Sequence, residues 1–282
     1  MMDATRWKVG GNTLDLTHRA LLMGVLNVTP DSFSDGGEFF AAEAAIKHGL
    51  AMARRGANII DVGGESTRPG SRPVLPNDEM GRVLPVIEQL AAEVAIPISI
   101  DTSKAAVARA ALDAGAVIIN DVSGGRADPE MFALAAERKV PLILMHMQGT
   151  PQTMQLAPAY NDVVNEVADF FRQRYEAAVR SGIDPMCIAF DPGIGFGKTV
   201  AHNLELLANL PRLRVENRPL VVGVSKKSFL GKLSDLPADR ASATVALTSL
   251  LRERGARVLR VHDVAPNAHA LRITEALLAA TR

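Results

Sequence analysis

Short apolar runs of strand length recur along the chain, and almost every residue within them is hydrophobic. This is typical of parallel strands buried on both faces, because a strand with one wet face alternates apolar and polar residues. The runs are Leu21–Val28, Ala57–Gly64, Pro97–Asp101, Val117–Val122, Pro141–Met147, Cys187–Gly193, Pro219–Val224 and Val258–Asp263. The pattern therefore predicts eight buried parallel strands.

Segments with the 3.6-residue period of amphipathic helices lie between these runs. A glycine directly after Arg55, Ala114 and Arg254 marks helix ends, since glycine readily adopts the left-handed conformation found there. Pro85 cannot donate a backbone hydrogen bond, so the second helix is expected to start or kink at this residue. The predicted helices are Ala41–Arg55, Glu79–Val94, Ser103–Ala114, Pro129–Arg138, Asn161–Arg180, His202–Leu210, Ala238–Arg254 and Pro266–Ala280.

The order of these elements indicates the fold. Eight strand–helix units without a linker or low-complexity segment predict one domain over residues 1–282, a TIM (β/α)8 barrel of the α/β class. An open Rossmann-like sheet is the alternative, but its glycine fingerprint is absent after the first strand. Residues 6–16 contain a Gly-Gly-Asn turn between two short runs, which predicts a short N-terminal hairpin that covers the floor of the barrel.

The composition argues against several kinds of partner. The 282 residues carry 31 basic and 31 acidic side chains, so no net field would attract nucleic acid or an anionic membrane. No apolar run approaches the ~18 residues that cross a bilayer, and residues 1–17 contain no signal-peptide core. Cys187 is the single cysteine and lies in an apolar run, so it is expected to pack rather than react. We expect a soluble, cytoplasmic protein.

Polar residues gather where the predicted strands end. In TIM barrels the chemistry lies at the carboxyl ends of the strands. A single aspartate there is often the cap of the next helix, and Asp101 by itself fits the role of a cap as well as that of a functional residue. Polar groups at all eight ends instead predict one large polar pocket at the barrel mouth. They include Asn27, Asp61, Glu65, Thr67, Arg68, Asp101, Asn120, Asp121, His146, Asp191, Ser225, Lys226, Lys227, Arg260, His262 and Asp263.

One set of these residues suits a phosphate or diphosphate, because arginine offers a planar fork that matches phosphate oxygens. This set is Asn27, Arg68, Arg260 and His262. His262 lies between apolar residues, so a core histidine is the alternative for that position. The hydroxyls and backbone N–H groups of the segment Gly-Val-Ser-Lys-Lys-Ser, which includes Ser225, suit a carboxylate.

A second set suits a flat heterocycle with several N–H groups, since carboxylates and amides accept such hydrogen bonds and a lysine donates to a carbonyl oxygen. This set is Asp101, Asn120, Asp191 and Lys227. Lys227 could alternatively form a Schiff base or belong to an ordinary solvated lysine pair. The glycines of Gly-Ile-Gly-Phe-Gly-Lys lack Walker spacing, so we interpret them as turn residues with Phe196 as a lid.

The segment 27–37, Asn-Val-Thr-Pro-Asp-Ser-Phe-Ser-Asp-Gly-Gly, is longer than most βα loops. Connections of this kind usually have about 2–6 residues, and longer ones tend to be functional. We expect Asn27 to belong to the rim of the barrel. Residues 30–37, with Phe33 and Asp35, are expected to form a mobile lid that depends on what occupies the pocket.

Six segments in order resemble the dihydropteroate synthases, a pterin-binding TIM-barrel family of the folate pathway and the target of sulfonamides. The resemblance covers nearly the whole chain and implies a transferase, commonly a homodimer through late helices. The segments are Asn-Val-Thr-Pro-Asp-Ser-Phe-Ser-Asp-Gly-Gly at 27–37, Asp-Val-Gly-Gly-Glu-Ser-Thr-Arg-Pro-Gly at 61–70, Ile-Asn-Asp-Val-Ser-Gly-Gly at 119–125, Asp-Pro-Gly-Ile-Gly-Phe-Gly-Lys at 191–198, Ser-Lys-Lys-Ser-Phe-Leu-Gly at 225–231 and Arg-Val-His-Asp-Val at 260–264.

The resemblance also implies roles for individual residues. The positions that match pterin contacts are Asp101, Asn120, Met145, Asp191, Phe196, Gly223 and Lys227. Those that match diphosphate contacts are Asn27, Thr67, Arg68, Arg260 and His262, with Mg²⁺ between Asn27 and the diphosphate. 4-Aminobenzoate is expected near Phe33, Thr67 and Pro69, with its carboxylate on Ser225. The residues expected to act in catalysis are Phe33, Asp35, Lys227, Arg260 and His262.

The implied reaction joins 6-hydroxymethyl-7,8-dihydropterin diphosphate and 4-aminobenzoate by a dissociative substitution at the pterin methylene. The product is 7,8-dihydropteroate, and diphosphate leaves. Three other classes share parts of the pattern. A pterin-binding methyltransferase serving a corrinoid partner should lack the long loop and the Arg-Val-His cluster. An aldolase would use Lys227 as a Schiff base. A non-catalytic binding protein would release no diphosphate.

Overall fold

The structure is a computed structural model that describes residues 4–29, 37–68, 70–233 and 239–281, with only the backbone for residues 37–41. Its strands are β1 (Arg6–Val9), β2 (Asn12–Asp15), β3 (Leu21–Asn27), β4 (Ile59–Gly63), β5 (Ile98–Asp101), β6 (Ile118–Asp121), β7 (Leu142–Met145), β8 (Ile188–Asp191), β9 (Val221–Gly223) and β10 (Val258–Val261). Its α-helices are α1 (Gly37–Arg54), α2 (Pro76–Glu93), α3 (Ala105–Asp113), α4 (Met131–Arg138), α5 (Val163–Arg180), α6 (Val200–Ala208), α7 (Arg240–Glu253) and α8 (Val264–Ala280).

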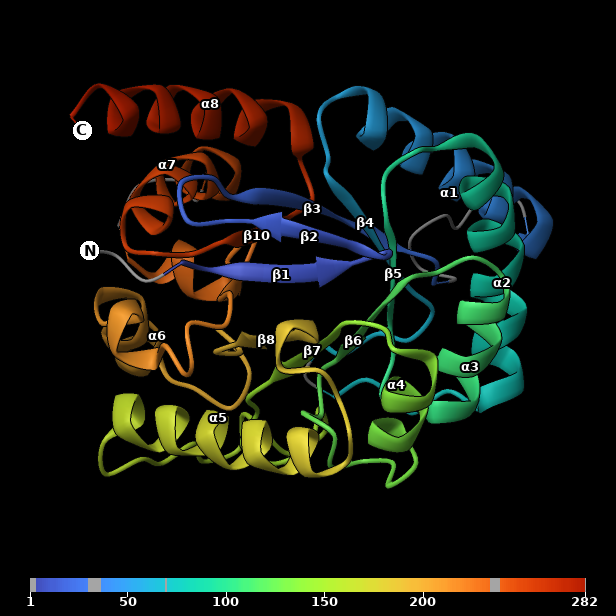
Figure 1. Ribbon diagram of the computed structural model, residues 1–282, viewed down its shortest axis with the longest axis horizontal. Helices are drawn as coiled ribbons and strands as arrows, with labels where there is room; N and C mark the ends of the chain where they lie inside the picture. The colour runs from blue at the N-terminus through green and yellow to red at the C-terminus, as the bar shows by residue number, and fades with distance from the viewer. Residues whose placement is uncertain (1–3, 30–36, 69, 234–238, 282) are drawn as a thin grey trace.

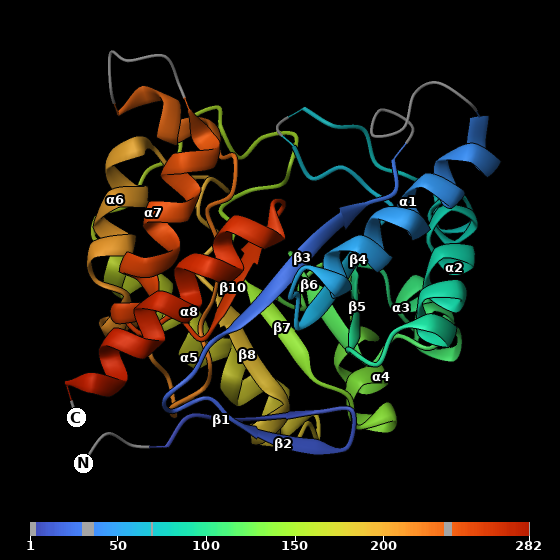
Figure 2. The ribbon, with the colours of Figure 1, turned by 90° about the horizontal axis from the view of Figure 1, so that it is seen from above.

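The eight strands β3–β10 form one parallel sheet in the order β8-β7-β6-β5-β4-β3-β10-β9. A parallel bridge between Phe190 and Leu220 joins the two outer strands, and the N–H of Phe190 donates to the carbonyl of Pro219 at 3.0 Å. The sheet thus curls into a nearly closed barrel, and the helices surround it as a ring (Figures 1 and 2). The predicted TIM barrel is confirmed, and all eight predicted strands are present.

The alternation of side chains along each strand divides the barrel into layers. Outward-facing residues pack with the helices in the larger core cluster, which includes Ile60, Ile119, Leu144 and Leu259. Inward-facing residues near the strand starts are apolar and form a second core cluster, with Ile59, Ile118, Ile143, Ala189, Val221 and Val258. Two residues further along the same strands, and therefore on the same face, stand Asp61, Asn120, Met145, Asp191, Gly223 and Arg260. The upper barrel interior is consequently polar and the lower interior is dry.

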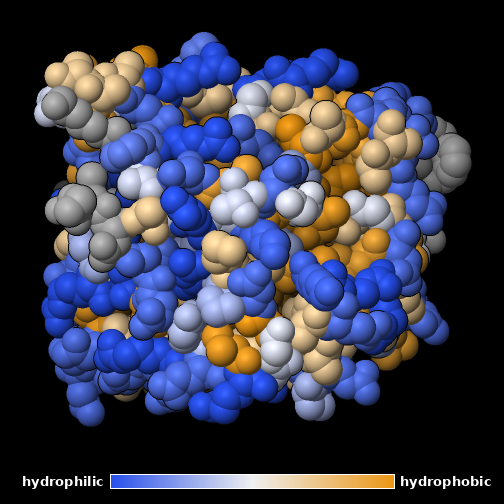
Figure 3. Space-filling model, in the orientation of Figure 1, coloured by the Kyte–Doolittle hydropathy of each residue, from blue (hydrophilic) through white to orange (hydrophobic). Residues whose placement is uncertain are grey.

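The hairpin of β1 and β2 closes the lower end of the barrel, as predicted, and faces the viewer in Figure 1. Trp7, Val9 and Leu16 are buried and pack with the apolar floor cluster. The surface on this side is mostly hydrophilic, with hydrophobic residues most continuous on the right of the view (Figure 3). Because the hairpin covers the lower end of the barrel, substrates have to enter from the opposite end, where the strands finish.

Helix α2 departs from the prediction, because it begins at Pro76 and runs through Pro85 without a break. A proline inside a helix leaves the carbonyl four residues earlier without its donor. That carbonyl belongs to Gly81, and both Pro85 and Gly81 are exposed, so water can satisfy it. The expected start at Pro85 is therefore wrong. No helix in the described part of the chain is long and apolar enough to cross a membrane.

Candidate active site

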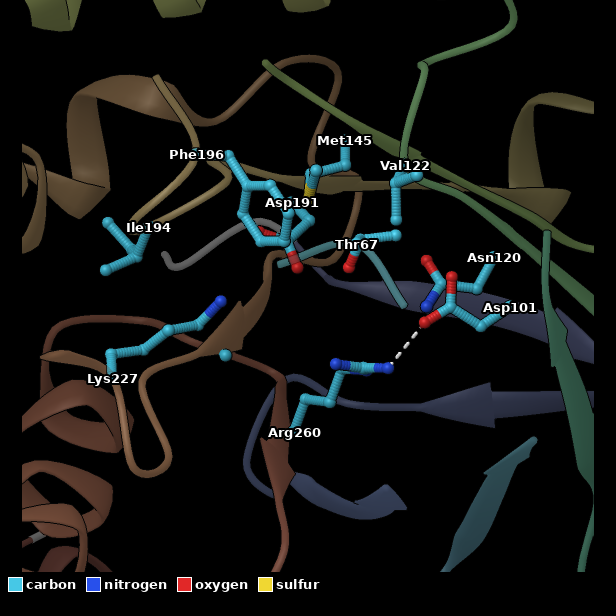
Figure 4. Close-up of a pocket in the computed structure, with 11 residues that line it drawn as sticks. Thr67, Asp101, Asn120, Val122, Met145, Asp191, Ile194, Phe196, Lys227 and Arg260 are labelled. Carbon is cyan, nitrogen blue, oxygen red and sulfur yellow. Dashed lines mark hydrogen bonds and ion pairs between the residues drawn. The ribbon is translucent and has the colours of Figure 1, made fainter. Parts of the chain in front are cut away.

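A pocket opens at the carboxyl ends of the barrel strands and has an empty volume of about 350 Å³. Its lining residues are Thr67, Asp101, Asn120, Val122, Met145, Asp191, Ile194, Phe196, Gly223, Lys227 and Arg260. Figure 4 shows their side chains converging from several strands and loops on one space. The predicted polar pocket at the barrel mouth is therefore present.

Arg260 lies at the centre of the charged network of the pocket. Its Nε donates to Asp61 Oδ2 at 2.6 Å and its Nη2 to Asp101 Oδ2 at 2.6 Å (the latter drawn in Figure 4). Asn120 Nδ2 donates to the same Asp61 oxygen at 3.1 Å. The sequence placed Arg260 with the phosphate-binding set, but the structure joins it directly to Asp101 of the heterocycle set, and through Asp61 to Asn120. One residue therefore links the two sets.

Burial shifts the ionisation of this network. It raises the pKa of Asp101 to about 7, although the Arg260 charge acts in the opposite direction. It also raises the pKa of Asp191, against the hydrogen bond that Asp191 Oδ1 accepts from the Gly193 N–H at 2.7 Å. For Arg260, burial lowers the pKa but Asp61 and Asp101 outweigh it, so the net shift is upward. Titratable groups with shifts in one cleft are typical of functional sites.

Lys227 reaches the pocket from the loop after β9. Its neighbour Lys226 adopts the left-handed conformation with φ 56° and pairs with Asp263, so the two lysines point to different partners. The Nζ of Lys227 lies 4.1 Å from the centroid of the Phe196 ring, within the range of a cation–π contact. Burial and the nearby Arg260 lower the pKa of Lys227 to about 8. The alternative of an ordinary solvated lysine pair is therefore wrong for Lys227.

Ser225 and His262 form a pair beside the pocket. The Ser225 hydroxyl lies 3.0 Å from His262 Nδ1 and accepts from the His262 backbone N–H at 3.1 Å. Burial and the charge of Arg260 lower the pKa of His262 to about 4, so its ring is neutral near pH 7. His262 is therefore a hydrogen-bonding group rather than a cation. The Ser225 hydroxyl, expected to meet a carboxylate, is bonded to this histidine.

The remaining predicted residues lie at the rim or outside the described part. Asn27 is partly exposed at the end of β3, and Thr67 lines the pocket. Arg68 is exposed and, unlike Arg260, is not among the residues that line the pocket. Phe33, Asp35 and Pro69 lie outside the described residues, as does most of the expected lid 30–37.

The loop that carries Thr67 is held by an ionic cluster that sequence reasoning missed. Lys104 donates to Glu65, near the start of the loop, and to Glu79 Oε2 in α2 at 2.5 Å. The side chain of Glu79 is fully buried, and the Val74 N–H donates to Glu65 Oε1 at 3.4 Å. Because these residues come from two βα loops and a helix, no sequence spacing indicated that they meet. The cluster fixes the loop on which Thr67 stands.

The turn after β8 contains Gly193, Gly195 and Gly197, all with positive φ. A Cβ at Gly193 would lie 1.9 Å from the carbonyl oxygen of His146, and one at Gly197 would lie 2.6 Å from that of Gln148. The expectation that these glycines shape a turn is confirmed. Two of them additionally let the turn pack directly on the backbone after β7.

Four further residues of the site were not assigned from the sequence. Val122 and Ile194 line the pocket, but apolar residues beside strands carry no signal that separates lining from core. Asp61 was noted only as a strand-end residue, although a fully buried carboxylate in an apolar run signals a charged partner. Lys198 is buried behind the turn after β8 and was taken as part of the turn motif.

The chain matches a family model described as pterin binding enzyme over residues 23–262. It is 46% identical over 271 residues to the dihydropteroate synthase of Synechocystis sp., covering 95% of this chain and 94% of that protein. The Xanthomonas albilineans dihydropteroate synthase solved with 4-aminobenzoic acid superposes with a TM-score of 0.90 at 46% identity, covering 98% of this chain and 99% of that one. Its complex with 7,8-dihydropteroate gives a TM-score of 0.86 at 45% identity, covering 97% of this chain and 99% of that one. With the family motifs gathered around one pocket and relatives matched along nearly its full length, the chain belongs to the dihydropteroate synthase family of pterin-binding transferases.

Proposed function

We propose that this chain is a dihydropteroate synthase: it joins 6-hydroxymethyl-7,8-dihydropterin diphosphate to 4-aminobenzoate and releases diphosphate. The observation that carries the proposal is the convergence of Asp101, Asn120, Asp191 and Lys227 on one pocket beside Arg260. A relative of this fold was solved with 4-aminobenzoic acid and with 7,8-dihydropteroate. The proposed activity is therefore supported by the residues of the pocket and by the ligands of a related protein.

The pocket suits a pterin ring in its hydrogen-bonding capacity. Carboxylates accept hydrogen bonds from amino and ring N–H groups, and we assign that role to Asp101 and Asp191. The Lys227 ammonium is a donor for the ring carbonyl oxygen. Met145 and Phe196 offer apolar faces to a flat ring, and Gly223 leaves space at the floor of the pocket. Together they would orient the methylene carbon of the substrate toward the barrel mouth.

We assign the diphosphate to the rim formed by Asn27, Thr67, Arg68 and His262. A neutral His262 binds it as a hydrogen-bond donor, while Arg260 contributes its charge from within the pocket. Among the described residues, no group of three or more His, Cys, Asp and Glu side chains is placed to hold a metal. The single amide oxygen of Asn27 still fits Mg²⁺, which commonly takes one or two protein ligands and completes its shell with phosphate oxygens and water. A bound Mg²⁺ would neutralise charge on the departing diphosphate.

We propose a dissociative reaction, in which diphosphate leaves before the aminobenzoate nitrogen attacks the methylene carbon. Asp35 would stabilise the transient pterin cation, and Phe33 would help enclose it. Positional isotope exchange within labelled pterin diphosphate, without aminobenzoate, should then occur. Asp35→Ala is expected to slow both exchange and turnover with little change in pterin affinity. Absence of exchange in an enzyme that binds the substrate would argue for concerted displacement.

The deciding experiment for the activity is diphosphate release by the purified chain with both substrates present. Release should require 4-aminobenzoate and should be abolished in Lys227→Met, which keeps the side-chain length but removes the charge. A folded wild-type protein that releases no diphosphate would refute the proposal. The lowered pKa of Lys227 also suits a Schiff-base lysine. If Lys227 serves the proposed synthase, borohydride treatment with carbonyl compounds should yield no adduct; a trapped Lys227 would favour an aldolase.

The rate should depend on pH through two groups of the pocket. Asp101, with a pKa of about 7, becomes protonated below that pH and loses its acceptor charge. Lys227, with a pKa of about 8, becomes neutral above that pH and loses its ammonium donor. A plot of kcat/KM for pterin diphosphate should be bell-shaped, with limbs that belong to the coupled groups. Lys227→Arg should move the alkaline limb upward; a wild-type profile that is flat from about pH 6 to 9 would contradict this assignment.

We also propose that the chain works as a cytoplasmic homodimer. Ile273 and Leu277 on α8 are 64% and 65% exposed, and Leu250 on α7 is 38% exposed, which suits burial against a second copy. Cys187 is buried and is the only cysteine, so the chain does not depend on a disulfide. Sedimentation should give twice the chain mass, and Ile273→Glu should shift it toward the monomer.

A further inference from the structure

Lys198 ends the glycine-rich turn after β8, and its side chain folds back beneath that turn. The residue is only 3% exposed. Its Nζ donates to the carbonyls of Gly193 at 3.1 Å and Phe196 at 3.0 Å, and it lies 3.0 Å from His146 Nδ1. A longer contact of 3.4 Å reaches the carbonyl of His146. One ammonium group thus joins both ends of the turn to the residue after β7.

The groups in direct contact with this ammonium are uncharged. An ammonium has three N–H donors, and its three short contacts are two carbonyls and one imidazole nitrogen. Burial lowers the pKa of His146 to about 2, so the ring is neutral and its Nδ1 can accept. No ion pair of Lys198 occurs among the described residues. Burial lowers the pKa of Lys198 to about 7, and the nearby Asp191 carboxylate acts in the opposite direction. A hydrocarbon side chain of similar size would fill this space without the cost of burying an amine.

Hydrogen bonds from outside the turn fix parts of its shape: the N–H groups of Gly193 and Gly195 donate to Asp191 Oδ1 and Asn203 Oδ1, each at 2.7 Å, and Gln155 Nε2 donates to the Gly195 carbonyl at 2.8 Å. Three glycines with positive φ supply no side chains for packing and leave the unfolded chain with high conformational freedom. Within the turn, the Phe196 N–H donates to the Gly193 carbonyl at 3.0 Å. Lys198 binds the same carbonyl and that of Phe196, so its donors stabilise this one conformation.

The conformation matters because the turn carries Phe196 into the pocket. The Phe196 ring lies over the Lys227 ammonium, with 4.1 Å between Nζ and ring centroid. Figure 4 shows Phe196 and Lys227 facing the same space as Asp191. A shift of the turn would move the ring away from Lys227 and open the pocket.

We propose that Lys198 is a positioning residue for the pterin substrate: its ammonium holds the 193–196 turn so that Phe196 closes the pocket over Lys227. This inference rests on the proposed function, because the substrate it names is the pterin diphosphate. Lys198 does not line the pocket and acts through Phe196.

The test uses Lys198→Met, which keeps the length of the side chain, and Lys198→Gln, which keeps one donor without the charge. Both should raise KM for pterin diphosphate, by about tenfold or more for methionine, as expected when hydrogen bonds to a charged group are lost. The kcat should change by no more than about twofold, because no group at the reacting atoms is altered. Tyr160→Phe is the matched control. It removes the hydroxyl that donates to the Gly197 carbonyl at 2.8 Å and should have a much smaller effect.

Two further measurements separate positioning from general stability. In a double-mutant cycle, Phe196→Leu and Lys198→Met should not be additive in KM, because both remove the same contact. Hydrogen exchange of the free protein should show faster exchange of the 193–197 amides in Lys198→Met, with β8 and α6 unchanged.

The outcomes are distinct for the two proposals. Unchanged KM and exchange in both variants, a loss confined to kcat, or additive effects with Phe196→Leu would each overturn the role of Lys198. Failure of both variants to fold would also overturn it, in favour of a purely structural lysine. A wild-type protein without activity would refute the proposed function, while the exchange measurement would still show whether Lys198 holds the turn.

Discussion

Replacing Arg260 with methionine is expected to lower the free energy of unfolding by about 3–5 kcal/mol, the usual cost of removing one partner from a buried ion pair. The Asp61 side chain is fully buried, and that of Asp101 is 12% exposed. Both carboxylates bond to Arg260, so the change leaves two like charges inside the barrel. Urea unfolding monitored by circular dichroism would measure the loss.

Two companion variants make this test specific. Arg109→Met removes an exposed ion pair with Glu137 and should cost far less than Arg260→Met, because solvent screens the exposed charges. Adding Asp61→Asn to Arg260→Met should recover part of the loss, because one of the two unpaired charges disappears. A loss below about 1 kcal/mol in Arg260→Met would mean that the two carboxylates find other partners or take up protons.

Gly193→Ala is expected to destabilise the protein by about 2–5 kcal/mol and to abolish most of its activity. About 1–2 kcal/mol follows from placing a Cβ at φ 62°. A further ~1–3 kcal/mol follows from steric overlap, since the new methyl would lie 1.9 Å from the backbone oxygen of His146. Because Gly193 also donates to Asp191, the displaced turn would disturb a pterin contact. Thermal unfolding and kcat/KM measure the two effects.

Gly10→Ala is the matched control for the backbone conformation. Gly10 has φ 55°, and a Cβ there would meet nothing within 4 Å. Its cost should be limited to the left-handed conformation, about 1–2 kcal/mol, and activity should persist because the hairpin lies at the opposite end of the barrel. Equal losses in the two variants would show that the contact with His146 relaxes freely.

The amino-acid sequence was sufficient for the fold and for most of the pocket lining. Near-continuous apolar runs identified the strands, because a strand buried on both faces has no polar face to alternate. Parallel strands end on the same side of the sheet, so residues at their ends had to share one mouth. That argument predicted Asp101, Asn120, Asp191, Lys227 and Arg260 as neighbours without any knowledge of distances.

The element boundaries were less well determined. Apolar runs extended one or two residues beyond the strands, as at Ala57–Gly64 against β4 (Ile59–Gly63). An apolar residue next to a strand packs in the same core whether or not it joins the ladder of hydrogen bonds. Helix α2 instead extends past a residue that was expected to start or kink it. A strong breaker, Pro85, was tolerated because it lies on the solvent side.

By itself, then, the sequence determined the barrel, its hairpin floor and the polar character of its mouth, since these follow from local periodicity and chain order. Only the tertiary structure decided which polar groups meet. Arg260 bonds to Asp61 across 199 residues of sequence, Ser225 bonds to His262, and Lys198 folds back beneath its own turn. Periodicity assigns a side chain to a face of a strand, but partner choice depends on register, on the curvature that closes the sheet and on loop conformations built from distant residues. Register, curvature and loop conformations are set only when the whole barrel has packed.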